Sequence, residues 1–424
     1  MPAYAGAERV FDALGFSGPL KQAARRCIGD LAGVWLRRDE NAFAVSARVI
    51  AAFRDAAIND SHLWGTTGYG YGDAARDAYE ALVARLMDAP AAMARPQLAS
   101  ATHALVATMR ALLSDGDVLC SLTGRPYDTL RTALVDHPHA VCAAGVRYVE
   151  CPWPFTPALD AELIAPALAR RPRVVFVQRS RGYAQRPALG VEQIGQLVAC
   201  VRLSCPQAVV VVDNCYGELV EEAEPGAVGA DLIVGSLVKN LGGAMAPAGA
   251  YIAGPRELIE RIGDSIFAPG LGSSVGPTLD TMRWCFAGLH RAPKAVTESL
   301  KIMDFAAALF DALGYEVQPQ AGAFRGDIIQ AIVLRSQAKV EAFVRGLQRM
   351  LPLNSRAVPQ PAAVPGYADP VIMAAGSFVG GSTLELSCDA PLRAPYAAYL
   401  QGGVDLAHGI VGTLSAAACV LDIN

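Results

Sequence analysis

Short apolar runs that end abruptly in polar residues recur along the middle of the chain. Residues 208–213 read Ala-Val-Val-Val-Val-Asp, and residues 231–236 read Asp-Leu-Ile-Val-Gly-Ser. Continuous β-branched runs of this length are typical of strands buried on both faces of a parallel sheet. Similar runs end near Ser121, Cys151 and Gln178. The repeated strand–helix–strand pattern over residues 95–253 predicts a mostly parallel α/β sheet with helices on both faces.

Helical periodicity dominates the regions before and after this sheet. Residues 1–60 predict an N-terminal helical segment, and residues 61–292 a large α/β domain. Residues 293–424 predict a smaller C-terminal α+β domain. We expect one helix over 279–289, just before that region, another over 293–313 at its start, and further on a strand over 384–388.

Composition narrows the class of protein. The 424 residues carry a net charge of −4 without any block of like charge, so nothing recruits nucleic acid or an anionic membrane surface. No run of about eighteen apolar residues predicts a membrane span, and the N-terminus lacks the pattern of a signal peptide. The ten cysteines form no C-x-x-C pair and have no zinc-finger spacing to histidine. We therefore expect reduced thiols, no metal site and a cytoplasmic protein.

The residues at two of these strand ends are candidates for a catalytic site. Asp213 ends one run, Ser236 ends the next, and Lys239 follows three residues later. Ligands of open α/β sheets bind at the carboxyl ends of the strands, so these residues are expected where chemistry takes place. An acid and a lysine so placed suit pyridoxal 5'-phosphate (PLP), with the acid on the pyridine nitrogen and the lysine in the Schiff base. The alternative is a helix-capping aspartate and a solvated loop lysine.

A second group of residues fits the phosphate and the ring of such a cofactor. Ser100 or Thr102 can cap the following helix, whose free N–H groups and dipole make an anion site together with the small Ala101. Tyr127 stands at a strand-to-helix turn where its ring could stack on a flat cofactor. A plain N-cap and a tyrosine packed at a turn are the structural alternatives.

Three further features are candidates with structural alternatives of their own. A glycine-rich loop over 65–73 carries Tyr69 and Tyr71, a combination that also occurs in ordinary surface loops. Gln178 and Arg179 begin a dense polar cluster at another strand end. Arg393 is a lone arginine beside a strand end, and a solvated surface residue is the alternative.

Nine motifs follow one another along the chain: Thr66-Thr-Gly-Tyr-Gly-Tyr-Gly-Asp73, Ser100-Ala-Thr-His103, Gly124-Arg-Pro-Tyr-Asp-Thr-Leu130, Gln178-Arg-Ser-Arg-Gly-Tyr183, Val212-Asp-Asn-Cys-Tyr-Gly-Glu218, Gly235-Ser-Leu-Val-Lys-Asn240, Pro365-Gly-Tyr367, Met373-Ala-Ala-Gly376 and Glu385-Leu-Ser387. With these motifs in this order, the chain resembles, over essentially its full length, the aluminium-resistance protein family, which consists of PLP-dependent, methionine gamma-lyase-like proteins. The family looks like fold-type I PLP enzymes of the cysteine and methionine metabolism group.

This resemblance implies roles for the candidate residues. Lys239 would form the Schiff base, Asp213 would pair with the pyridinium, and Tyr127 would stack on the ring. Ser100, Thr102 and Ser236 would hold the phosphate, where Ala101 replaces the glycine usual for the family. Tyr69 or Tyr71 would reach the phosphate in a neighbouring subunit, which implies a homo-oligomer, a dimer of dimers.

Together these observations predict a PLP-dependent lyase that acts on a γ-substituted L-amino acid. Lys239 would remove the Cα proton, and a second proton would be lost at Cβ. Tyr127 would act as general acid, and Arg393 would bind the substrate carboxylate, with Arg179 and Gln178 as further substrate-binding candidates. The expected leaving group is a thiolate or a halide. The alternatives are a β-eliminating C–S lyase, a γ-replacement transferase, and a PLP-binding stress-tolerance protein without turnover.

Overall fold

The computed structural model describes residues 7–16, 18–155 and 158–423, and its contacts divide the chain into two compact units. The large-sheet unit comprises Val45–Ala292. The small-sheet unit comprises Met1–Ala44 together with Pro293–Asn424. The division falls within two long helices, α3 (Ala32–Asp55) and α10 (Met282–Ala312). The segment 1–60, which we expect to form one helical part, is therefore shared between the two units.

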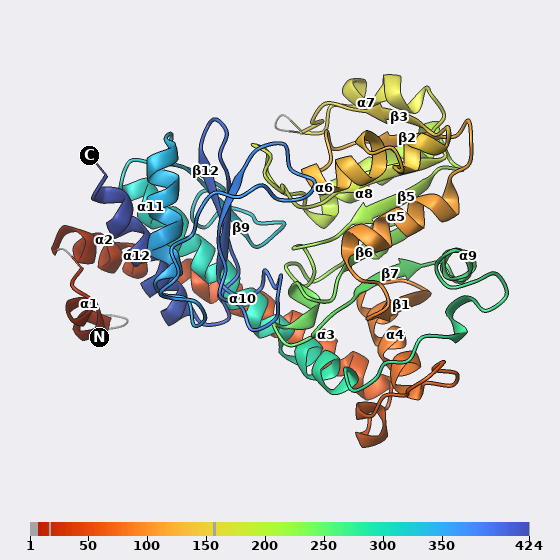
Figure 1. Ribbon diagram of the computed structural model, residues 1–424, viewed down its shortest axis with the longest axis horizontal. Coiled ribbons are helices and arrows are strands. Elements are labelled where there is room, and N and C mark those ends of the chain that lie inside the picture. Colours follow the sequence, from red (N-terminus) through yellow and green to blue (C-terminus); the bar gives the residue numbers. More distant parts are fainter. Residues whose placement is uncertain (1–6, 17, 156–157, 424) are drawn as a thin grey trace. The chain divides into compact units, whose positions relative to one another are not determined.

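A seven-stranded sheet forms the centre of the large-sheet unit, with the strand order β1-β7-β6-β5-β4-β2-β3 (Figure 1). Strands β3, β2, β4, β5 and β6 are parallel, whereas β7 pairs antiparallel with both β6 and β1. The mostly parallel sheet predicted from the apolar runs is thus confirmed. The strands are β1 (Ala91–Arg95), β2 (Val118–Ser121), β3 (Arg147–Glu150), β4 (Val174–Gln178), β5 (Val209–Asp213), β6 (Leu232–Ser236) and β7 (Ala250–Gly254).

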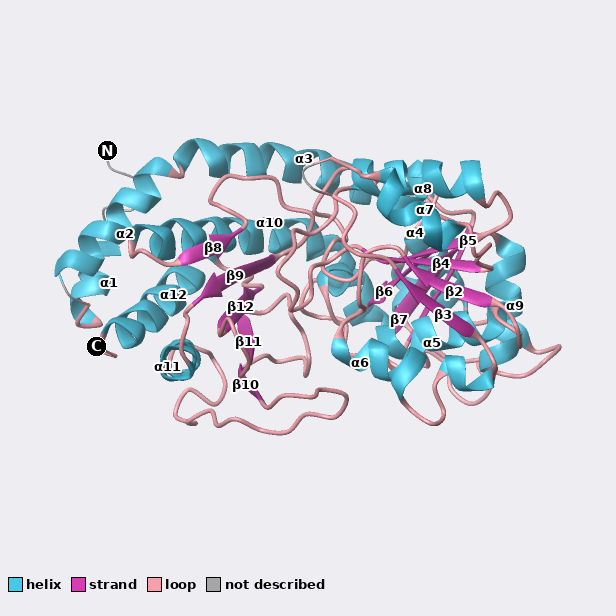
Figure 2. Cartoon of the chain, turned by 90° about the horizontal axis from the view of Figure 1, so that it is seen from above, coloured by secondary structure: helices cyan, strands magenta, loops and turns pink. Residues whose placement is uncertain are grey.

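Helices cover both faces of this sheet, as parallel strands require. One face packs on α5 and α9 through a core that includes Leu105 and Ile259. The opposite face packs on α7 and α8 through a second core that includes Ile164 and Leu197. Figure 2 shows the strands between α7 and α8 on one side and α5 on the other. The helices of this unit besides α3 and α10 are α4 (Ala74–Leu86), α5 (Ala101–Leu112), α6 (Asp128–Arg131), α7 (Ala161–Leu168), α8 (Val191–Ser204) and α9 (Arg256–Ile266).

The small-sheet unit contains an antiparallel sheet of five strands, in the order β10-β11-β12-β9-β8. Its core joins this sheet to helices from both ends of the chain, for example through Leu20, Phe310 and Leu414. The elements are α1 (Ala7–Ala13), α2 (Gly18–Asp30), β8 (Glu316–Gln318), β9 (Ile329–Val333), α11 (Gln337–Gln348), β10 (Val371–Ala374), β11 (Ser387–Pro391), β12 (Ala397–Gln401) and α12 (Leu406–Leu421). No helix within the described ranges has the length and hydropathy needed to cross a membrane.

Two element predictions are wrong. The helices expected over 279–289 and 293–313 are one helix, α10, which continues through Pro293. A proline removes one helical hydrogen bond, but the residues on both sides of it are buried, and this burial keeps the helix continuous: Leu289, Ala292 and Val296 are all 0% exposed. The strand expected over 384–388 begins only at Ser387, where pairing with β12 starts. Leu384 and Leu386 are buried ahead of the strand.

Candidate active site at the carboxyl ends of the strands

The polar ends of three parallel strands lie next to one another in the large-sheet unit. In the register of the sheet, Gln178 at the end of β4 pairs with Asp213 at the end of β5, and Asp213 pairs with Val234 of β6. Lys239 follows the end of β6 and precedes a short 3-10 turn over Asn240–Gly242. The strand order therefore places the predicted lysine and the predicted acid next to each other at the carboxyl ends of β5 and β6.

Lys239 is partly exposed and is surrounded by acidic groups. Its Nζ atom lies 4.0 Å from the centroid of the Tyr216 ring. Burial lowers the pKa of Lys239, but the surrounding acidic groups raise it well above the usual value: Cys215, Tyr216, Tyr127 and Asp213. Lys239 is therefore an ammonium in the protein without a cofactor.

Asp213 is buried, with 2% of its surface exposed, and its carboxylate accepts a hydrogen bond of 3.1 Å from the backbone N–H of Cys215. Burial raises the pKa of Asp213, while the Lys239 ammonium and the hydrogen bonds from Cys215 oppose this shift. A buried acid of this kind is stabilised when a cation is placed against it. The protonated ring nitrogen of a pyridine would be such a cation.

The beginning of α5 is the place where we expect the anion site. Ser100 is the N-cap, and its Oγ accepts a hydrogen bond of 3.0 Å from the N–H of His103. The helix begins at the buried Ala101. Thr102 Oγ1 lies 3.3 Å from the Tyr127 hydroxyl. The first turn of α5 and Tyr127 are thus in contact.

Tyr127 links this helix to the lysine and the acid. Burial raises the pKa of Tyr127 well above the usual value, and Asp213 raises it further while Lys239 lowers it. The phenol therefore keeps its proton at neutral pH. The structure brings Thr102, Tyr127, Asp213 and Lys239 together, whereas Ser236 is buried and its Oγ accepts a hydrogen bond of 3.3 Å from the N–H of Val238.

Gln178 and Arg179, the start of the polar cluster at the end of β4, form contacts within the fold. Gln178 accepts a hydrogen bond of 3.1 Å from the N–H of Tyr127 and donates one of 2.9 Å to the carbonyl of Ser180. Gln178 therefore holds Tyr127 in place by its backbone.

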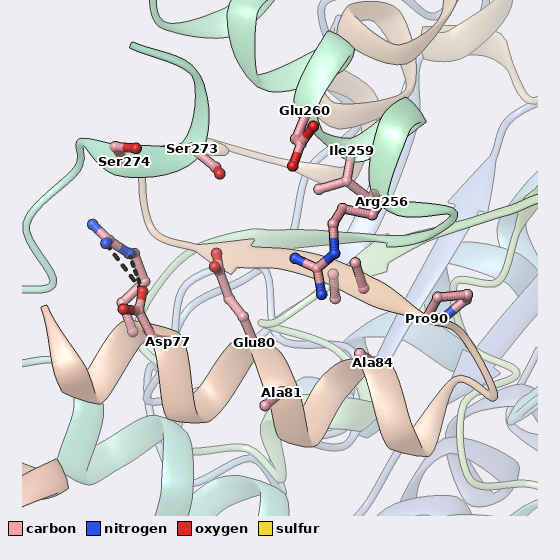
Figure 3. Close-up of a pocket in the computed structure, with 13 residues that line it drawn as sticks. Asp77, Glu80, Ala81, Ala84, Pro90, Arg256, Ile259, Glu260, Ser273 and Ser274 are labelled. Carbon is pink, nitrogen blue, oxygen red and sulfur yellow. Dashed lines mark hydrogen bonds and ion pairs between the residues drawn. The ribbon is translucent and has the colours of Figure 1, made fainter. Parts of the chain in front are cut away.

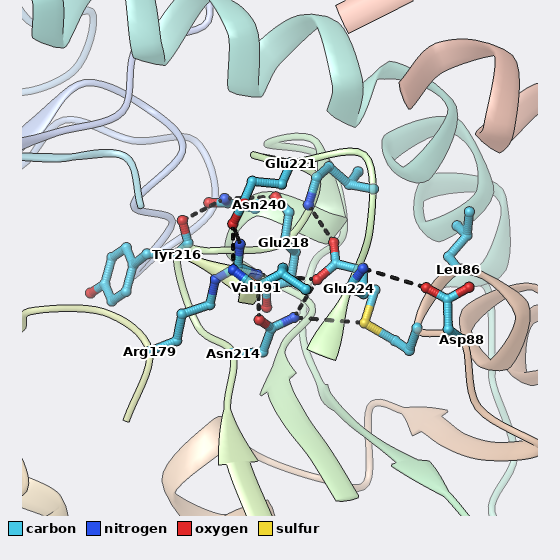
Figure 4. Close-up of polar contacts among 12 residues, drawn as sticks. Leu86, Asp88, Arg179, Val191, Asn214, Tyr216, Glu218, Glu221, Glu224 and Asn240 are labelled. Atoms are coloured by element: carbon cyan, nitrogen blue, oxygen red, sulfur yellow. Dashed lines mark hydrogen bonds and ion pairs between the residues drawn. The ribbon is translucent and has the colours of Figure 1, made fainter. Parts of the chain in front are cut away.

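Arg179 is 0% exposed, and its guanidinium binds acidic and amide groups of the loop after β5 (Figure 4). Nη2 lies 2.7 Å from Glu221, and Nη1 lies 3.2 Å from Glu224 and 2.8 Å from Asn214. These contacts occupy the guanidinium donors inside the fold, and the role of Arg179 in binding the substrate stays a prediction.

Tyr69 and Tyr71 are 79% and 59% exposed, on a loop whose backbone is firmly held. The carbonyl of Tyr69 accepts a hydrogen bond of 2.9 Å from the N–H of Gly276. Asp73 accepts hydrogen bonds from Thr66 and Thr278, and these lower its pKa to about 2 although burial opposes the shift. An ordered loop with two exposed phenols suits a contact with another molecule.

Arg393 lies in the small-sheet unit, where its side chain is 37% exposed and forms an ion pair of 3.2 Å with Asp369. Its role in binding the substrate carboxylate stays a prediction.

Sequence reasoning missed Tyr216, Glu218 and Asn240. Tyr216 places its ring against Lys239, and its φ of 69° is unusual for a residue other than glycine. The Asn240 amide donates hydrogen bonds to the carbonyls of Tyr216 and Glu218, at 2.9 and 3.0 Å. The only sequence signal was their inclusion in the two motifs around Asp213 and Lys239.

A separate hollow of about 360 Å³ lies between α4, β1 and α9 (Figure 3). Charged side chains of both signs line it, among them Asp77, Arg256 and Glu260, and none of the predicted site residues does. We assign it no role in the chemistry.

Comparisons with known proteins agree with this fold. A family model described as methionine gamma-lyase matches residues 20–420. A structure from Clostridium acetobutylicum, described as a "putative cystathionine beta-lyase involved in aluminum resistance", is 33% identical with a TM-score of 0.93, covering 98% of this chain and 99% of that one. A structure described as a carbon-sulfur lyase involved in aluminum resistance, from Clostridium novyi NT, is 34% identical with a TM-score of 0.91 and the same coverage.

A more distant likeness concerns the fold alone. The PLP-dependent protein YhfS from Escherichia coli is 15% identical, with a TM-score of 0.60 over 92% of this chain and 97% of that one. The structure therefore has a fold like that of fold-type I PLP-dependent enzymes, as the sequence predicts.

Proposed function

The chain belongs to the methionine gamma-lyase family, and on this premise we propose that it is a PLP-dependent carbon–sulfur lyase that eliminates a γ-substituent from an L-amino acid. The proposal rests on one observation. Lys239, Asp213, Tyr127 and Thr102 lie close together at the carboxyl ends of the parallel strands. The family membership also confirms the resemblance on which the residue roles were predicted.

The residues present fit PLP. Lys239 is partly exposed and would hold the aldehyde carbon, and the buried Asp213 would face the ring nitrogen. The first turn of α5, with Ser100, Ala101 and Thr102, would hold the phosphate, because unpaired N–H groups and the helix dipole favour an anion there. Ser236 and the Tyr127 ring complete the set predicted from the motifs.

When bound, PLP supplies an electron sink that stabilises negative charge on the substrate at Cα and Cβ. Lys239 would take the proton from Cα and move it within the site, because a lysine in its uncharged amine form is a base. Asp213 would keep a proton on the ring nitrogen. Tyr127, which burial keeps protonated, would donate a proton to the departing sulfur.

Two proposals concern the surroundings of the site. Arg393 would bind the substrate carboxylate through two of its three guanidinium nitrogens. Tyr69 and Tyr71 would reach the phosphate of a neighbouring subunit, so that the active protein is a symmetric oligomer. The exposure of both phenols on a firmly held loop supports this second proposal.

A second candidate is β-elimination, which the description of the Clostridium acetobutylicum neighbour favours. The two reactions are distinguished by their products. Incubation with a γ-thioether amino acid should release a thiol, ammonia and a four-carbon 2-oxo acid. A three-carbon oxo acid from a β-thioether substrate would instead establish β-elimination. Transfer of the amino group without release of thiol or ammonia would contradict both.

A further inference from the structure

The solvent-exposed side of helix α3 is apolar, whereas the exposed side of a surface helix is ordinarily polar. Leu36, Phe43 and Ile50 are 61%, 81% and 56% exposed and follow one another at intervals of seven residues. About seven residues make two turns of an α-helix, so these three side chains lie on one side of α3. Between residues 41 and 53 the exposed residues are Phe43, Ala47 and Ile50, all of them apolar. We call Leu36, Phe43, Ala47 and Ile50 the α3 stripe.

The other side of α3 is buried within the chain. Val45, Val49 and Ala52 are 1%, 1% and 0% exposed, and this burial fixes which side of the helix is directed to solvent. A single exposed apolar residue is ordinary on a protein surface, but a contiguous row of large ones marks a contact with another molecule. The α3 stripe is such a row, and no described residue of the same chain covers it.

Charges of opposite sign stand at equal distances from the middle of the α3 stripe. Glu40 comes seven residues before Ala47 and Arg54 comes seven residues after it, and both are exposed. By the helical repeat, both fall on the side of α3 that carries the stripe. When a second α3 is laid antiparallel on the first around a two-fold axis at Ala47, Glu40 of each copy faces Arg54 of the other copy. The same arrangement brings Phe43 of each copy next to Ile50 of the other copy.

The contacts of these two charged residues within the chain leave room for such pairing. The side chain of Arg54 is 75% exposed and forms an ion pair of 2.8 Å with the neighbouring Asp55. A guanidinium has five N–H donors, so it can bind a second carboxylate. Glu40 has no ion pair among the described residues. A parallel arrangement would instead place Glu40 against Glu40 and Arg54 against Arg54, which is unfavourable.

The same charges argue against a membrane as the molecule that covers the stripe. Helices that lie on membranes carry many lysine and arginine residues beside the apolar face, because they bind anionic lipids. The α3 stripe has one acid and one base instead. This pattern is complementary to itself, so it fits a second copy of the chain.

We propose that α3 is a self-association surface, through which two copies of this chain pair antiparallel around a two-fold axis at Ala47. The pairing involves neither PLP nor the residues of the proposed active site, so it goes beyond the proposed function. It is also separate from the contact proposed for Tyr69 and Tyr71. A chain with two self-complementary surfaces assembles as a dimer of dimers, and the α3 stripe supplies one of these two surfaces.

The first experiment replaces Phe43, at the centre of the stripe, with glutamate in the full-length protein. The change should raise the dissociation constant between paired copies on the order of a hundredfold or more, because a buried aromatic residue is lost twice in a symmetric contact. Light scattering combined with size-exclusion chromatography should then show Phe43→Glu with half as many subunits as wild type. Leu203→Glu is the matched control and should keep the wild-type mass, because Leu203 is a single residue on α8 that is 87% exposed. A wild type that is monomeric, or a Phe43→Glu protein with the mass of wild type, would overturn the proposal.

The second experiment tests the antiparallel arrangement through its charges, at exposed positions that do not affect folding. Glu40→Lys and Arg54→Glu each turn two attractive pairs into repulsive ones, so each should weaken the association about tenfold at low salt. Mixing the two variants should restore it, because in a mixed pair the introduced lysine faces the introduced glutamate and the native Arg54 faces the native Glu40. Sedimentation velocity measures both effects. Single variants that associate as tightly as wild type would overturn the antiparallel pairing.

These outcomes are independent of the proposed lyase activity. If PLP fails to attach to Lys239 but Phe43→Glu still has half the subunits of wild type, the proposed function fails and the α3 pairing stands. If PLP attaches and the mass of Phe43→Glu is unchanged, the α3 pairing fails and the proposed function stands.

Discussion

Replacing Arg179 with methionine removes the cation from a closed cluster of acidic and amide groups. The guanidinium is 0% exposed and lies 2.7 Å from Glu221, 3.2 Å from Glu224 and 2.8 Å from Asn214. Methionine fills much of the same space but leaves Glu224, itself 0% exposed, without its counterion. Removing one partner of a buried ion pair costs about 3–5 kcal/mol. In a domain of this size, that corresponds to a fall of the melting temperature by on the order of 10 °C.

Thermal unfolding of Arg179→Met measures this cost directly. Arg125→Met is the matched control, because Arg125 belongs to the same unit, its side chain is 57% exposed, and it lies 3.8 Å from Asp136. Loss of such a surface pair costs about 0–1 kcal/mol. The double variant Arg179→Met/Glu224→Gln should recover part of the loss, since it also removes the stranded charge. An unchanged melting temperature together with a raised KM would refute this reasoning and support the substrate-binding role predicted from the sequence.

Two further predictions concern the Tyr69–Tyr71 loop. Gly70→Ala should loosen it, because the backbone has a φ of 70° and the added Cβ would lie 2.5 Å from the Pro277 nitrogen; Gly68→Ala, with a φ of 69° and no atom within 4 Å, is the control. Faster hydrogen exchange over the loop in Gly70→Ala alone is the expected result, and equal exchange in both variants would contradict it. Mixing inactive Lys239→Ala with an inactive Tyr69→Phe/Tyr71→Phe variant should restore part of the activity, since one site of a mixed oligomer receives both intact groups. If mixed oligomers form and stay inactive, the loop serves its own subunit.

The sequence predicted the strands correctly where an apolar run ends directly in a polar residue. The runs ending in Gln178, Asp213 and Ser236 have the β-branched composition of buried strands, and the structure ends β4, β5 and β6 at these same residues. Parallel strands bring their carboxyl ends to one edge of a sheet. The meeting of Asp213 and Lys239 could therefore be predicted without a structure.

Contacts between residues that are far apart in the sequence could not be predicted from local patterns. Arg179 directly follows the end of β4, close to the position that Asp213 has at the end of β5, but its partners are Glu221 and Glu224, more than forty residues along the chain. The hydrogen bonds from Asn240 to Tyr216 and Glu218 likewise join loops that are more than twenty residues apart. Pro293 indicates a helix break by local rules, and only the burial of the helix around it explains why α10 continues.

The lysine that holds PLP is the central claim, and the chain offers a direct test because it has only five lysines: Lys21, Lys239, Lys294, Lys301 and Lys339. Lys239 is the one that falls within residues 45–292, which contain the large sheet. The protein should be reconstituted with PLP, reduced with borohydride, digested and analysed by mass spectrometry. We predict a reduced pyridoxyl group on the peptide that contains Lys239, and none in Lys239→Ala. A label on one of the other four lysines, or no label at all, would contradict the account.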